Sequence, residues 1–99
     1  MTRPAPPFVP QTDEAYHQWR HAHPEGFVLN VRRSLQPNYM VLHTAECGHI
    51  RTHSSPGAFT ERNYRKVCAS DPEVLRDWAR EHGRPDGSFS KECPDCRPQ

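Results

Sequence analysis

The sequence predicts a small α+β domain in which two helices accompany a three-stranded antiparallel sheet and a four-cysteine zinc site cross-links the fold. The chain has 99 residues, enough for one small domain and too few for two. Only 33% of these residues are hydrophobic, so the apolar core is lean for this length. A lean core favours an additional cross-link, and four cysteines are available to provide it.

The first segment is predicted to lie outside the domain. Residues 1–11 contain four prolines and no periodic pattern, which indicates a flexible leader before a single domain at 12–99. No run approaches the roughly 20 apolar residues of a membrane span. The N-terminus also lacks the apolar region of a secretory signal, so we expect a cytoplasmic protein without a membrane partner.

A helix and a hairpin are predicted to follow. Thr12 or Asp13 can cap a helix that runs to about His21. Apolar runs at residues 27–33 and 39–44 predict two strands. The five-residue connection between them fits an antiparallel hairpin.

The second half supplies the third strand and the second helix. Residues 65–69 (RKVCA) have the composition of a short strand. The helix at about 72–82 has apolar residues on one face, and Ser70 with Glu73 forms the pattern of a capping box. Gly83 is placed to end this helix.

The cysteines carry the clearest chemical signal. Cys93-Pro94-Asp95-Cys96 is a C-x-x-C turn, which can direct two thiolates at one metal ion. Cys47 follows the second predicted strand and Cys68 ends the third. In a reducing compartment cysteines are more often metal ligands than disulfides. The favoured interpretation is therefore a structural Zn²⁺ held by Cys47, Cys68, Cys93 and Cys96.

Other interpretations of these cysteines remain open. His49 or His43 could replace one cysteine as a ligand. Alternatively, Cys47 and Cys68 could be small buried apolar residues with no metal nearby. A thioredoxin-like pair is disfavoured because its C-x-x-C motif should open a helix, and no helix fits before the C-terminus.

Charge gives a local signal for a partner. The net charge is only +1, so bulk charge does not predict nucleic-acid binding. Residues 51–66, however, contain four cations against one acid, interleaved with Phe59 and Tyr64. Arginines contact phosphates and aromatic rings stack on bases, which predicts a DNA-binding surface. The predicted contact residues are Arg32, Arg33, Arg51, Arg62, Tyr64, Arg65 and Lys66.

Two further function classes are compatible with the sequence. A protein-interaction or regulatory module would explain the Pro-rich leader and the balanced charge equally well. A metal-dependent hydrolase or nuclease would use histidines near Cys47, but no residue is assigned a catalytic role. An enzyme is therefore the least supported of the three classes.

The order of several motifs is informative as a set. They are 24–30 (PEGFVLN), 39–43 (YMVLH), Cys47, 64–68 (YRKVC), 78–80 (WAR) and 93–96 (CPDC). This order resembles a family of small uncharacterised actinobacterial domains, which occur alone or appended to larger proteins, nucleases among them. The resemblance covers residues 16–96 and implies that the four cysteines form one set. It also draws attention to Thr60, Tyr64 and Lys66, whereas Phe59 stands where the family has Trp.

Overall fold

The computed structural model of the chain describes residues 6–47, 60 and 63–94. The elements follow one another in the order α1 (Asp13–Ala22), β1 (Phe27–Arg32), β2 (Met40–Thr44), β3 (Tyr64–Ala69), α2 (Pro72–Glu81) and β4 (Lys91–Glu92). The α+β class and the two helices are confirmed. None of the described helices has the length and the apolar character needed to cross a bilayer.

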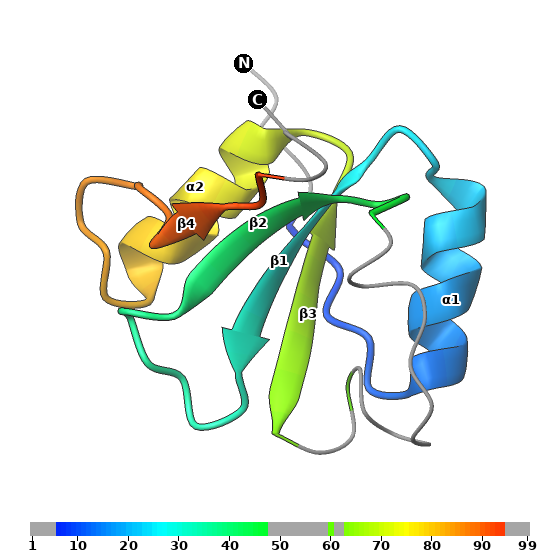
Figure 1. The fold of residues 1–99 in the computed structure, drawn as a ribbon, viewed down its shortest axis with the longest axis horizontal. Helices are drawn as coiled ribbons and strands as arrows, with labels where there is room; N and C mark the ends of the chain where they lie inside the picture. Colours follow the sequence, from blue (N-terminus) through cyan, green and yellow to red (C-terminus); the bar gives the residue numbers. More distant parts are fainter. Residues whose placement is uncertain (1–5, 48–59, 61–62, 95–99) are drawn as a thin grey trace.

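The strands form one sheet in the order β3-β1-β2-β4 (Figure 1). The central strand β1 pairs antiparallel with both β2 and β3. The fourth strand, β4, pairs parallel with β2. The prediction of three antiparallel strands is therefore corrected to a four-stranded mixed sheet.

Tertiary hydrogen bonds, rather than a sequence pattern, place β4. The Ser90 hydroxyl accepts from the Met40 backbone N–H at 2.7 Å, and the Ser90 N–H donates to the Met40 carbonyl at 2.9 Å. After the two-residue strand, the Cys93 N–H donates to the Leu42 carbonyl at 2.9 Å. Cys93 is thereby fixed at the sheet edge beside the end of β2.

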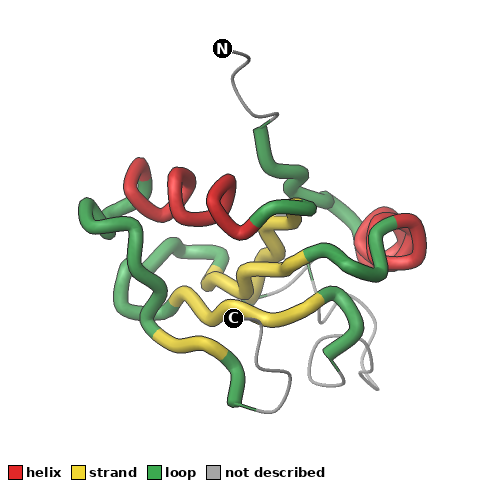
Figure 2. The backbone as a smooth tube through the Cα atoms, turned by 90° about the horizontal axis from the view of Figure 1, so that it is seen from above, coloured by secondary structure: helices red, strands yellow, loops and turns green. Residues whose placement is uncertain are grey.

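Helix α2 covers one face of the sheet with a conventional apolar core (Figure 2). Its Leu75 and Ala79 are fully buried against residues of the three long strands, among them Leu29, Leu42 and Val67. Alternation along each strand brings these residues to one face. This side of the fold follows from the apolar pattern alone.

The opposite face is covered in part by α1 and is more polar. Tyr16 of α1 is fully buried against Val28 and three cysteines. Trp19 packs against the same cluster. A side chain at Gly26 would meet the Trp19 ring at 2.6 Å, so the close approach of α1 to the start of β1 requires glycine there.

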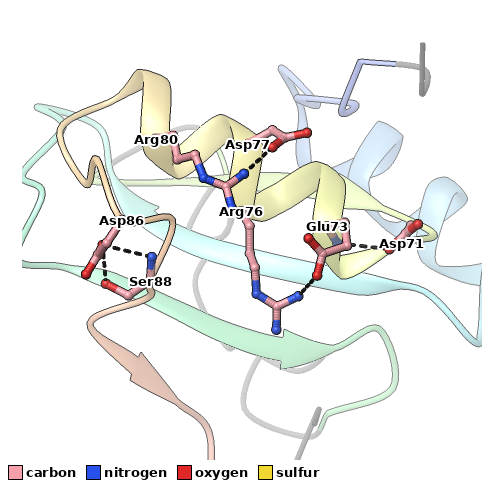
Figure 3. Close-up of polar contacts among 7 residues, drawn as sticks. All are labelled: Asp71, Glu73, Arg76, Asp77, Arg80, Asp86 and Ser88. Atoms are coloured by element: carbon pink, nitrogen blue, oxygen red, sulfur yellow. Dashed lines mark hydrogen bonds and ion pairs between the residues drawn. The ribbon is translucent and has the colours of Figure 1, made fainter.

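Side-chain caps fix the start of each helix. The Thr12 hydroxyl accepts from the Ala15 N–H at 3.1 Å, as predicted for α1. For α2 the cap is Asp71, whose carboxylate accepts from the Glu73 N–H at 2.9 Å, and not the predicted Ser70 (Figure 3). The carboxylate is one residue closer to the helix, where it can reach the exposed N–H groups of the first turn.

Part of the predicted leader lies on the sheet. Phe8 forms an isolated antiparallel bridge with Cys68, with both hydrogen bonds at 2.8 Å. This bridge covers the outer edge of β3, which would otherwise present unpaired backbone groups. The flexibility predicted for residues 1–11 therefore does not extend to the paired residue.

Candidate metal centre

One group of metal-ligating side chains forms among the described residues. His43, Cys47 and Cys93 each offer one ligand atom, and these three atoms all lie within 4.8 Å of one another. The three residues are 6%, 4% and 4% exposed, respectively. A buried imidazole and two buried thiols at this separation can hold a metal ion.

The separation of the two sulfur atoms fits a tetrahedral ion. The Sγ atoms of Cys47 and Cys93 are 3.8 Å apart. Two sulfurs that are each about 2.3 Å from a zinc ion at a tetrahedral angle would be about 3.8 Å apart. The distance is well beyond an S–S bond of about 2.05 Å. A thiol–thiol hydrogen bond would also fit it.

Three separate elements bring these residues together. His43 is the penultimate residue of β2, and a turn after the strand returns Cys47 towards it, with the Cys47 N–H donating to the Thr44 carbonyl at 3.1 Å. Cys93 comes from the C-terminal segment, fixed by its hydrogen bond to Leu42. The site therefore connects the end of the described chain to the end of the hairpin.

Cys68 is not part of this group, although the sequence favoured it as a ligand. Cys68 pairs with Val28 on one side, and Val28 pairs with His43 on the other. One whole strand, β1, therefore lies between them, and neighbouring strands are about 4.8 Å apart. The other cysteine of the C-x-x-C turn, Cys96, and the alternative ligand His49 lie outside the described residues.

The surroundings of Cys68 are those of a buried thiol. It is 1% exposed, and burial raises its pKa to about 12, an effect that the nearby Lys66 and Arg20 partly oppose. Burial also raises the pKa of the neighbouring Tyr16 hydroxyl. Both groups are held in their neutral forms at neutral pH. Because the thiolate is the form that binds metals and attacks electrophiles, Cys68 has the environment of an inert structural residue.

Lys66, a predicted nucleic-acid contact, is buried. Only 3% of it is exposed, and its ammonium group donates to the Asn30 side-chain carbonyl at 2.8 Å. The same group lies 5.8 Å from the ring centres of Tyr16 and Tyr64. Burial lowers its pKa to about 8. Lys66 is thus committed to the interior of the fold and cannot reach a phosphate on the surface.

Four other predicted contact residues lie near the end of β1, together with Tyr39, which was not predicted: Arg32, Arg33, Tyr64 and Arg65. The Arg32 guanidinium lies 4.8 Å from the Tyr39 ring centre and 5.6 Å from that of Tyr64. Arg33 and Arg65 are exposed. We call these five residues the arginine–tyrosine surface. The remaining predicted contacts, Arg51 and Arg62, lie outside the described residues.

Several described histidines have structural partners instead of a metal. His17 lies 2.8 Å from Arg20, and burial and that guanidinium lower its pKa. The rings of His23 and His82 stack on Trp19 and Trp78, with centroids 4.5 and 3.9 Å apart. These contacts occur within or at the ends of the two helices.

Comparisons of the chain with models of protein families, with curated proteins and with solved structures found no match. The resemblance to small actinobacterial domains therefore stays a prediction. The case for any function rests on the geometry of the chain itself.

Proposed function

We propose that the chain is a zinc-stabilised binding module whose ion is held by His43, Cys47, Cys93 and Cys96. The observation that carries the proposal is the 3.8 Å separation of two buried sulfurs beside a buried imidazole. A histidine with three cysteines is a common ligand set for structural zinc. Cys96 is proposed as the fourth ligand because a C-x-x-C turn suits two thiolates on one ion.

The proposed role of the ion is structural. Four protein ligands leave no position for a water molecule, which a hydrolytic zinc site needs. The ion would instead connect β2 to the C-terminal segment beyond β4. This role suits a domain with few apolar residues on that side of the sheet. The hydrolase or nuclease alternative would require an open coordination position.

The proposed partner is a nucleic acid, contacted through the arginine–tyrosine surface. Arg32 carries a positive charge between two half-exposed tyrosine rings, Tyr39 and Tyr64. Arg65 is exposed, and its guanidinium has no partner among the described residues. Exposed arginines beside aromatic rings are what a module needs to bind phosphates and stack on bases. The alternative is that the chain is a protein-interaction module, whose partner is another protein.

The metal part of the proposal is tested by metal analysis of matched variants. The purified chain should contain one zinc ion per molecule, and His43→Ala, Cys93→Ser and Cys96→Ser should each lose it. Cys68→Ala is the control, because it removes a buried thiol that lies outside the group. If Cys68→Ala loses zinc and His43→Ala retains it, the ligands are the four cysteines and not the set proposed here. A metal-free purified chain would overturn the site.

The partner is tested by salt dependence. Binding to an oligonucleotide should weaken steeply between low and physiological salt, because arginine contacts release condensed counterions. Arg32→Ala should weaken it further, whereas Arg80→Ala on the outer side of α2 should not. No binding at low salt, together with recovery of a defined protein partner, would favour the interaction module instead.

A further inference from the structure

A cavity lies beside the arginine–tyrosine surface, on the sheet face that α2 covers. Its volume is about 250 Å³, and its apolar lining includes Val31, Val67 and Trp78. Arg32, Arg33 and Arg65 also line it, and none of the described residues that line it is acidic. An apolar lining with cations around it is complementary to an anion that carries an apolar or aromatic group.

The volume limits what can enter. Sites for drug-sized ligands usually span roughly 300–1,000 Å³. A cavity somewhat smaller than this fits one nucleobase with its sugar, but not a base pair. The arginines would then meet the phosphate that such a base carries.

A strained residue stands among the lining residues. Leu35 has a φ of 45°, in the left-handed region that a leucine rarely adopts. Its side chain is 37% exposed, one of two large apolar side chains that are so exposed among the described residues. Neither the strain nor the exposure stabilises the fold, and such features concentrate at binding sites. An apolar group on a ligand would give this side chain a partner.

We propose that this cavity accepts a single unstacked nucleotide, which makes single-stranded nucleic acid the substrate class. The inference rests on the proposed nucleic-acid function and deepens it. Arg32 belongs to both places, since it lines the cavity and lies over Tyr39 and Tyr64. A strand could therefore place one base in the cavity with its backbone on Arg33 and Arg65. Alternation places the Tyr64 ring on the opposite face of the sheet from Arg65, so a second base would reach a tyrosine only by passing Arg32 at the end of β1. A base within a duplex could not enter without leaving its stack.

The test compares a single-stranded oligonucleotide of about ten nucleotides with a duplex of the same sequence, by fluorescence anisotropy at low salt. The single strand should bind about tenfold more tightly, the effect of one base contact. Leu35→Gly should weaken single-strand binding several-fold while the melting temperature stays unchanged or rises, because glycine adopts this φ without strain. Arg65→Ala should weaken it about as much. Arg80→Ala is the matched control, because Arg80 is an exposed arginine of α2 that does not line the cavity.

The outcomes separate the two proposals. Equal affinity for single strand and duplex, with Leu35→Gly unchanged, would overturn the cavity inference and leave nucleic-acid binding in place. No binding of either oligonucleotide at low salt would overturn the function itself and the inference with it. If Leu35→Gly weakens single-strand binding and also lowers the melting temperature, Leu35 stabilises the fold. That result would overturn its role as a contact for the nucleotide.

Discussion

The two faces of the sheet are stabilised by different chemistry. On the α2 face, Leu29, Leu42 and Leu75 are fully buried among other apolar side chains. On the α1 face, the buried groups include His43, Lys66 and three thiols. Burial of apolar groups is favourable in itself, whereas a buried polar group costs free energy unless it has a partner.

On the α1 face, specific partners offset the free-energy cost of burying these polar groups. Lys66 donates to Asn30, and Asp13 accepts from both the backbone N–H and the hydroxyl of Thr60, at 2.9 and 2.7 Å. For the group around His43, the proposed partner is a metal ion. One face of the sheet therefore depends on apolar packing, and the other depends on particular partners for its buried polar groups.

Removal of the metal should have the largest effect on the stability of the domain, and it should act through the α1 face. Structural zinc contributes on the order of 10 kcal/mol of apparent binding free energy at neutral pH, comparable to the whole stability of a small domain. A chelator should therefore abolish the cooperative thermal transition and the near-ultraviolet circular dichroism. An unchanged melting curve after chelation would mean that the α1 face is stable without the ion.

A substitution that creates a new cavity under α2 should have the next largest effect on stability, and it should not release the metal. Leu75→Ala removes a fully buried side chain and should cost about 2–5 kcal/mol of unfolding free energy, measured by urea denaturation. Metal analysis at low temperature should give the same zinc content as the unsubstituted chain. Loss of zinc in this variant would show that the two faces are not independent.

The pH dependence of stability tests the cost of burying Lys66. Its pKa is about 8 in the fold against an ordinary value of 10.5, so between these values the unfolded chain binds more protons. The unfolding free energy should therefore rise with pH across this range, relative to Lys66→Met, by on the order of 3 kcal/mol. The buried Cys68 thiol acts in the opposite direction above pH 9, but both proteins carry it. Parallel pH profiles of the two proteins would contradict the buried charge.

The smallest effect is expected on the outer side of α2. Arg76 forms an ion pair with Glu73, and Arg80 forms one with Asp77, each across one turn (Figure 3). Such pairs across one turn of a helix surface contribute about 0.2–0.5 kcal/mol. Arg76→Ala should therefore leave the urea midpoint nearly unchanged, in contrast with Leu75→Ala one residue earlier. A loss of several kcal/mol would indicate that Arg76 also supports the Phe89 ring that it covers.

Local patterns predicted most of the fold. The strands at 27–33 and 39–44 and the second helix lie within a residue or so of their observed bounds, because apolar runs and helical periodicity record which face is buried. β4 could not be predicted, because its two residues are exposed and its pairing depends on Ser90 and Cys93. No local pattern encodes a contact that is made only in the assembled sheet.

The candidate site was predicted in part for a similar reason. Cysteine spacing indicated a metal site and left His43 open as a ligand. The distance of Cys68 from the other ligands depends on the strand order, because β1 separates the strand of Cys68 from β2. The local spacing of residues does not determine strand order. One available signal was missed: alternation places Lys66 on the same face as Cys68, so a buried cysteine there predicts a buried lysine.

X-ray absorption at the zinc edge is the most direct test of the proposed ligand set, because it counts the sulfur and nitrogen atoms around the ion in the intact chain. We expect three sulfur ligands at about 2.3 Å and one nitrogen ligand at about 2.0–2.1 Å. His43→Cys would be the matched variant, and its spectrum should change to four sulfur ligands. Four sulfur ligands in the unsubstituted chain would rule out His43 as a ligand, and the absence of any zinc signal would rule out the metal site.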